Sequence, residues 1–185
     1  MKKMMSAKEL VCCGVCIALA FALSYVRIFS LPYSGSVTLC SMFFICYAGY
    51  CFGPTAGLIC GAIYGLLQFW QGAYILNLLQ LCCDYFLAFT ALGLAGFFHK
   101  KGYKGMIVGY IIGVLFRGAF HTLGGYLFYM DYVPEEFIKK FKIVALYPIF
   151  YNYLYLLIEM AITLVILALP PVKQALERIR NMATE

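Results

Sequence analysis

The chain has 185 residues, of which 64% are hydrophobic and only 12% are charged. Soluble globular domains carry about 25% charged residues, so this composition excludes a soluble domain and indicates an integral membrane protein. The net charge of +6 does not indicate nucleic-acid binding, because the basic residues lie before the first apolar segment, in loops and after the last apolar segment rather than on one polar face.

Six apolar segments, separated by charged residues, glycine and proline, predict six transmembrane helices. A spanning helix needs about 20 mostly apolar residues. The first run, Leu10–Val26, exceeds the ~7–15 apolar residues of a signal peptide, so we expect it to remain as the first helix. No strand is expected, and the fold class is an all-α bundle of six transmembrane helices. The predicted helices cover residues 9–30, 37–52, 54–70, 73–98, 105–130 and 144–169.

The first predicted helix carries a ladder of small residues at every fourth position, Gly14, Ala18 and Ala22. Small residues at this spacing let a second helix approach closely. That second helix belongs either to a partner protein or to the same bundle, and both interpretations stay open at this point.

The Lys and Arg residues outside the helices predict the orientation. With both termini in the cytoplasm, nine lie on the cytoplasmic side and four on the other side, as expected from the excess of basic residues in cytoplasmic loops. Residues 1–170 form the predicted six-helix membrane domain, and residues 171–185 form a short basic cytoplasmic tail, either helical or disordered. The location that follows is the plasma membrane, with several passes. The nine are Lys2, Lys3, Lys8, Lys100, Lys101, Lys104, Lys173, Arg178 and Arg180, and the four are Arg27, Lys139, Lys140 and Lys142.

Three charged residues, Asp84, Arg117 and Glu159, fall inside predicted helices together with His121 and Asn152. Such residues are costly in a bilayer and by default face the bundle interior, where they mark a binding site or form a structural ion pair. Arg117 and His121 are four positions apart and share one face of the fifth helix. Asn152 and Glu159 share a face of the sixth helix. The sequence therefore predicts polar groups from three helices in one interior region.

The aromatic residues are numerous, with 16 Tyr, 16 Phe and one Trp. They act either as anchors at the membrane interface or as the lining of an outward-facing pocket, where ring faces beside a carboxylate would suit an organic cation. Those expected at the outer ends of the helices are Tyr33, Trp70, Tyr74, Tyr129, Tyr132 and Tyr147.

The sequence contains no GxxxxGK[ST] phosphate-binding loop, no HExxH motif and no GxSxG motif. If the chain drives uphill transport, the energy must therefore come from another subunit or from an ion gradient. Nine cysteines all lie in or beside apolar runs, where cysteine acts as a small hydrophobic residue, so neither a disulfide nor a metal site is expected. No cofactor is predicted.

Four stretches resemble one known family, the thiamine-specific substrate-binding subunit (S-component) of energy-coupling factor vitamin transporters. Their residues are the ladder Gly14–Ala18–Ala22; Gln80–Asp84–Tyr85, continuing through Leu92–Gly96; Arg117–His121 with Tyr129, Tyr132 and Pro134; and Tyr147, Tyr151, Asn152, Tyr155 and Glu159. The resemblance runs from the first helix to Glu159.

This resemblance implies a high-affinity thiamine site near the outer face, with the first external loop as a lid. It implies that the small-residue ladder docks on a transmembrane coupling subunit, itself bound to two ATPase subunits, and that the chain is not an enzyme. Members of the family can have Glu at the position of Asp84 and Trp at that of Tyr129, so a thiamine precursor or analogue also fits. The implied ligand contacts are Asp84, Tyr85, His121, Tyr129, Tyr147 and Asn152.

Three other interpretations remain beside it. One is an S-component for another vitamin. A second, from a different class, is an intramembrane enzyme that uses His121 with Asp84 or Glu159. The third is a purely structural membrane protein.

Overall fold

A computed structural model of the chain describes residues 5–31, 35–72 and 75–185. Tyr33 and Tyr74, expected among the outer aromatic residues, lie outside the described residues, as do Lys2 and Lys3. All further structural statements concern the described part of the chain.

Helices occupy most of each apolar segment. Local signals set several of their ends: Ser6 and Glu9 form a reciprocal capping box at the start of the first helix, and Gly53, with φ +91°, precedes Pro54 at the start of the third. The helices are α1 (Ala7–Ser24), α2 (Ser41–Phe52), α3 (Pro54–Trp70), α6 (Gly102–Phe128), α7 (Glu135–Phe141), α8 (Tyr147–Ala168) and α9 (Pro170–Thr184), with short 3₁₀ turns η4 (Met130–Tyr132) and η5 (Val144–Leu146).

The fourth apolar segment is a composite helix rather than a uniform one. It consists of α4 (Leu78–Leu81), the π-helical turn η2 (Cys82–Leu87), α5 (Ala88–Thr90) and the 3₁₀ helix η3 (Ala91–Phe98). Its first residue is Leu78, five residues later than the predicted start.

Four helical stretches are long and apolar enough to cross a membrane: Ala7–Ser24, Leu78–Phe98, Gly102–Phe128 and Val144–Ala168. Large apolar side chains on them are exposed, as lipid-facing residues are, with Leu10 at 64% and Val165 at 68%. The protein is therefore a helical membrane protein. Ten of the 12 residues of the shorter α2 are buried, which makes it a central helix surrounded by protein. That six segments span the bilayer stays a prediction.

The expectation that the chain has no strands was wrong. The first helix ends at Ser24, and the chain then forms a hairpin in which β1 (Arg27–Ser30) pairs antiparallel with β2 (Ser36–Thr38). Strands of four and three residues are too short to show a reliable alternation of apolar and polar residues, so the sequence pattern concealed them. Their backbone groups pair with each other, and β2 also contacts α8.

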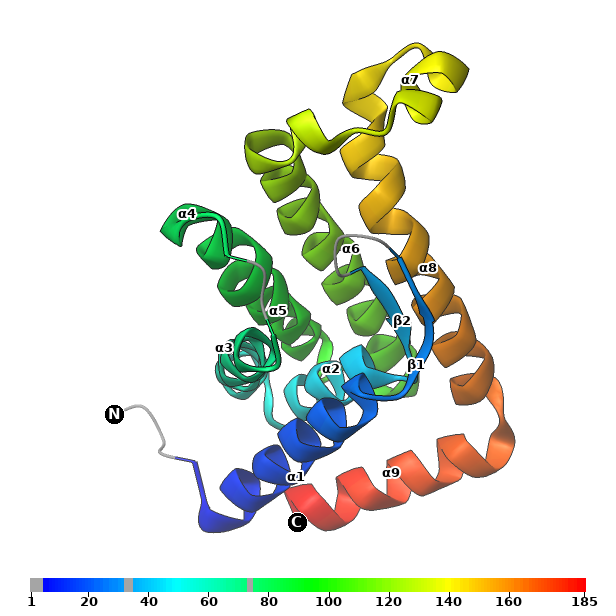
Figure 1. Cartoon of the computed structure of the whole chain (residues 1–185). Coiled ribbons are helices and arrows are strands. Elements are labelled where there is room, and N and C mark those ends of the chain that lie inside the picture. Colours follow the sequence, from blue (N-terminus) through cyan, green and yellow to red (C-terminus); the bar gives the residue numbers. More distant parts are fainter. Residues whose placement is uncertain (1–4, 32–34, 73–74) are drawn as a thin grey trace.

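Figure 1 shows α6 and α8 side by side, with the hairpin lying near both of them. At the lower end of the view, α9 crosses the base of the molecule, and its end lies near the start of α1. Arg180 holds α9 in place by donating hydrogen bonds to the Tyr50 hydroxyl and to the backbone carbonyl of His99. The sequence left open whether the tail is helical or disordered, and in the structure it is the helix α9. The segment α7 lies at the opposite end of the molecule (Figure 1).

Close packing between α3 and η3 depends on glycine. A Cβ atom added to Gly93 would clash with the backbone carbonyl carbon of Gly57, far inside van der Waals contact. This close approach brings the composite helix against α3, and it sets the position of the π-helical turn that precedes η3.

Candidate functional site

A cavity of about 410 Å³ lies among the hairpin, α3, the composite helix, α6 and α8. Its volume is within the range of about 300–1,000 Å³ that is usual for small-molecule sites. All six residues expected to contact a ligand line it: Asp84, Tyr85, His121, Tyr129, Tyr147 and Asn152. The tertiary structure thus brings together residues that lie far apart in the sequence.

The π-helical turn η2 positions Asp84 and Tyr85. Turns of this kind are rare and occur frequently at functional sites, because the wider backbone turn changes the direction of the side chains it carries. Gly124 of α6 leaves room for the carboxylate, since a Cβ atom there would lie 2.7 Å from Asp84 Oδ1. Asp84 therefore faces α6 closely.

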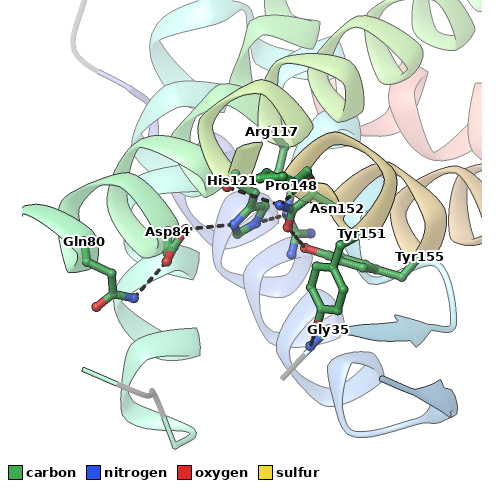
Figure 2. Close-up of polar contacts among 9 residues, drawn as sticks. All are labelled: Gly35, Gln80, Asp84, Arg117, His121, Pro148, Tyr151, Asn152 and Tyr155. Carbon is green, nitrogen blue, oxygen red and sulfur yellow. Dashed lines mark hydrogen bonds and ion pairs between the residues drawn. The ribbon is translucent and has the colours of Figure 1, made fainter. Parts of the chain in front are cut away.

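Four polar side chains form a chain of hydrogen bonds along one wall of the cavity (Figure 2). Gln80, only 1% exposed, donates from Nε2 to Asp84 Oδ2 over 2.8 Å. His121 Nδ1 lies 3.3 Å from Asp84 Oδ1, and Arg117 Nε donates to His121 Nε2 over 3.3 Å. The charges of Asp84 and Arg117 are thus linked through His121.

Arginine only donates hydrogen bonds, so His121 Nε2 must be the unprotonated ring nitrogen that accepts from Arg117. The proton of a neutral His121 then lies on Nδ1 and is donated to Asp84 Oδ1. Each carboxylate oxygen of Asp84 accepts one hydrogen bond from the protein, and each has a second lone pair. Asp84 can therefore still bind a positively charged or amino group inside the cavity.

Arg117 has a second contact, because its guanidinium carbon lies 4.1 Å from the centre of the Phe89 ring. A cation over an aromatic face is attracted to it. Arg117 is thus held by Phe89 and His121, both of which also line the cavity.

Asn152 is held from three sides. Its Nδ2 group donates to the backbone carbonyls of His121, over 3.3 Å, and of Pro148, over 2.9 Å, and its Oδ1 accepts from the Tyr155 hydroxyl over 3.2 Å. With both amide protons used, what Asn152 offers a ligand is the second lone pair of Oδ1. Asp84 and Asn152 together present acceptors, which suit a ligand with amino groups or positive charge.

Aromatic rings cover much of the remaining surface. The rings of Tyr85 and Phe89 stack at 6.5 Å, and those of Tyr147 and Tyr151 lie 5.8 Å apart. Of the aromatic residues expected at the outer ends, Tyr129, Tyr132 and Tyr147 line the cavity, whereas Trp70 is 85% exposed and is not among the described lining residues.

The hairpin closes one side of the cavity through Gly35. Its backbone N–H donates to the Tyr151 hydroxyl over 3.0 Å, and a Cβ atom on Gly35 would lie only 2.6 Å from that oxygen (Figure 2). The absence of a side chain at Gly35 therefore allows the hairpin to approach α8.

Glu159, which also lines the cavity, anchors the same hairpin from α8. Its carboxylate, 2% exposed, accepts from the backbone N–H and hydroxyl of Thr38, from the Ser41 hydroxyl and from the backbone N–H of Met42. Ser41 and Met42 open α2, so the negative charge lies at a helix N-terminus, where it is favoured. Glu159 joins β2, α2 and α8 and needs no cationic partner to satisfy its oxygens.

We expect the substitution Glu159→Gln to destabilise the protein. An amide offers a single accepting oxygen, so donors that now meet the second carboxylate oxygen lose their acceptor, at about 1–3 kcal/mol for each one left unpaired. Thermal unfolding of the purified protein should show a lower midpoint, whereas Glu136→Gln, on the exposed helix α7, should leave it unchanged. An equal midpoint for Glu159→Gln and the unsubstituted protein would contradict this role.

The sequence analysis named Gln80 only as part of the family resemblance, not as a site residue, and it missed the cavity residues Gln68 and Gln71 altogether. A signal was available, because polar amides inside apolar helices are unusual: Gln80 lies one turn before Asp84, and Gln68 and Gln71 lie one turn apart. The hairpin residues Arg27 and Gly35 could not be found in this way, because the hairpin itself was not predicted.

Gly14, Ala18 and Ala22 are not among the described lining residues of the cavity. All three are exposed, and nothing in the described structure lies within 4 Å of a Cβ atom added to Gly14. Val15 and Leu19 beside them are exposed as well. This face of α1 is therefore not packed against the described part of the bundle.

Comparison with known proteins adds a family match and two similar proteins. The family model described as "Thiamine transporter protein" matches residues 10–178. The thiamine transporter ThiT of Bacillus subtilis is 31% identical over 153 residues, which cover 76% of this chain and 77% of that protein. A solved structure of ThiT from Listeria monocytogenes is 23% identical and has a TM-score of 0.64, with 95% of this chain and 92% of that chain covered; at this identity it shows the fold alone.

Proposed function

The chain belongs to the thiamine transporter family, and from this premise we propose that it binds thiamine in the cavity beside Asp84 as the substrate-capturing subunit of an uptake transporter. It is a multi-pass protein of the plasma membrane. The observation that carries the proposal is the Asp84 carboxylate, which keeps accepting capacity within an aromatic-lined cavity.

The chemistry of thiamine matches this lining. Thiamine has a permanently charged thiazolium ring, an aminopyrimidine ring and a hydroxyethyl arm. We assign the positive charge or the amino group to Asp84 and a hydrogen-bond donor of the ligand to Asn152 Oδ1, which accepts but has no free proton. Tyr85, Tyr129, Tyr147 and His121 would surround the rings.

Energy for uphill uptake would come from other subunits, because the sequence has no phosphate-binding loop. We propose a transporter of the energy-coupling factor type, in which a transmembrane coupling subunit carries two ATPase subunits. Its docking surface on this chain would be the exposed face of α1 at Gly14, Ala18 and Ala22, where small side chains allow close helix contact.

An intramembrane enzyme is less well supported by the geometry, although His121 and Asp84 lie side by side. The nitrogen of His121 that would take a proton from a substrate, Nε2, already accepts from Arg117. Glu159 is likewise occupied by four donors from Thr38, Ser41 and Met42. In both pairings the histidine nitrogen that would act as the base is therefore already engaged by Arg117 within the described residues, and the family is one of transporters.

Isothermal titration calorimetry of the detergent-purified protein tests the proposal. We expect one equivalent of thiamine to bind tightly and to be recovered unchanged. Biotin and riboflavin should give no heat, and the isolated aminopyrimidine precursor should bind more weakly because it lacks the cationic ring. Tight binding of another vitamin in place of thiamine, or release of a reaction product, would refute the assignment.

We also propose that both termini are cytoplasmic, with residues 1–170 in the membrane and residues 171–185 on its inner surface. The N-terminal end of α1 and the C-terminal end of α9 lie at the same end of the molecule (Figure 1). The distribution of basic residues places this end in the cytoplasm under our proposal. A reporter enzyme fused after Glu185 should be active only when it folds in the cytoplasm. Activity restricted to an external reporter would reverse the orientation.

A further inference from the structure

Two glutamines of α3 and its C-terminal cap present unpaired amide nitrogens to the cavity. Gln68 Nε2 and Gln71 Nε2 are buried and have no hydrogen-bond partner within residues 5–31, 35–72 and 75–185, and both residues line the cavity. A buried N–H group without a partner loses the hydrogen bond that water gives it in the unfolded chain. The arrangement therefore calls for an acceptor that the described protein does not supply.

The position of these amides is set by α3. Tyr64, Gln68 and Gln71 follow one another at helical spacing, so they share one face, and all three line the cavity. The carbonyl oxygen of Gln71 already has a partner, since Ser24 Oγ lies 3.2 Å from it. The nitrogen is the end of the Gln71 amide that remains for a ligand.

This face lies next to the turn that carries Asp84. A Cβ atom on Gly65 would clash with the backbone carbonyl of Tyr85, so α3 and the π-helical turn are in direct contact about one helical turn before Gln68. Phe69 also packs against the ring of Tyr85, with ring centres 6.0 Å apart. Gln68 and Asp84 therefore line the same cavity from two elements that pack directly against each other.

Arg27 adds a positive charge to the same lining. It lies on β1, is exposed, and belongs to neither of the two ion pairs found within the described residues, which join His121 with Asp84 and Lys139 with Glu135. Arg27 thus adds a cationic donor to the cavity lining that also holds the two amides, and Ser24, three residues before it in the chain, contacts the Gln71 side chain.

We propose that Gln68, Gln71 and Arg27 form a subsite for the oxygen-bearing arm of the ligand, taking either its free hydroxyl group or a phosphate ester of that group. The inference rests on the proposed function, because it assumes that Asp84 holds the ring from which the hydroxyethyl arm extends. The free hydroxyl group and the phosphate ester both carry acceptor oxygens, which match the amide N–H groups. Only the phosphate ester is negatively charged and would be stabilised by the charge of Arg27.

The test titrates thiamine and thiamine monophosphate into the purified full-length protein and into three variants. In Gln68→Glu a carboxylate of nearly the same shape replaces the donor and repels a phosphate group, so the affinity for thiamine monophosphate should fall about tenfold more than the affinity for thiamine. In Arg27→Gln the affinity for thiamine should stay within about twofold, while that for thiamine monophosphate should fall about tenfold. Gln174→Glu, the same change on exposed helix α9, should alter neither.

Arg27 is exposed on the hairpin, so its variant gives a result even where Gln68→Glu lowers folding yield. Equal losses for the two ligands in both variants, or no loss in either, would overturn the subsite while leaving thiamine binding in place. If Gln68→Glu loses affinity while Arg27→Gln binds thiamine monophosphate as tightly as the unsubstituted protein, the subsite holds the free hydroxyl group and Arg27 is not part of it. Failure of the unsubstituted protein to bind thiamine would refute the proposed function itself, and the subsite with it.

Discussion

Replacing Asp84 with asparagine should weaken thiamine binding by about tenfold to a hundredfold. A hydrogen bond to a charged group contributes about 1.5–3 kcal/mol, and about 1.4 kcal/mol corresponds to a factor of ten in affinity. Asparagine keeps the shape of the side chain and removes its charge, so the substitution tests electrostatic attraction to the ligand. The loss should be read by calorimetry on both proteins under the same conditions.

Two comparisons separate ligand binding from a structural role of Asp84, which also accepts from Gln80 and His121. A neutral analogue, with an uncharged ring in place of the thiazolium, should lose much less affinity in Asp84→Asn than thiamine does. Asp131→Asn, on the exposed turn η4, should bind thiamine like the unsubstituted protein. A lower unfolding midpoint without ligand, combined with an unchanged dissociation constant, would show that Asp84 serves only the hydrogen-bonded chain.

Replacing Ala18 with phenylalanine should abolish thiamine uptake by cells and leave binding by the purified protein intact. Ala18 lies on the exposed face of α1 and is not among the described lining residues of the cavity. A bulky ring there would hold a docking helix away from Gly14 and Ala22, and close packing is what drives helix association in a membrane. Uptake of labelled thiamine should fall to the level of cells that lack the protein.

The matched control is Ala161→Phe, the same change at an exposed alanine of a different helix, α8. It should support normal uptake, because it lies away from the proposed docking face. Equal loss of binding and uptake in Ala18→Phe would mean that the substitution disturbs the fold. Normal uptake in Ala18→Phe would move the coupling surface to another part of the chain.

The amino-acid sequence alone was enough to establish the class of protein and most of its helical segments. The thickness of the bilayer sets the length of the apolar runs, because each spanning helix needs about 20 apolar residues, and this requirement also sets the composition. The family resemblance is confirmed by the match over residues 10–178. Asp84, His121 and Asn152 were recognisable as candidates for the same reason, because polar groups inside apolar helices are costly unless they meet one another or a ligand.

How these groups pair depends on the folded molecule. Asp84 and Arg117 are both charged, yet the contact between them runs through His121, which depends on the rotation of the π-helical turn relative to α6. Helical periodicity assumes a uniform turn and cannot predict a local change to a wider one. The sequence therefore identified the residues on each helix and left their partners undetermined.

The roles of Glu159 and the hairpin also came from the structure alone. Glu159 accepts hydrogen bonds from Thr38, Ser41 and Met42, which are more than a hundred residues away in the chain. Such long-range contacts leave no spacing pattern in a single sequence, and strands of three or four residues show too little alternation to be recognised. Local patterns determined where the helices lie, whereas the cavity arises from contacts between residues far apart in the chain, which only the folded molecule defines.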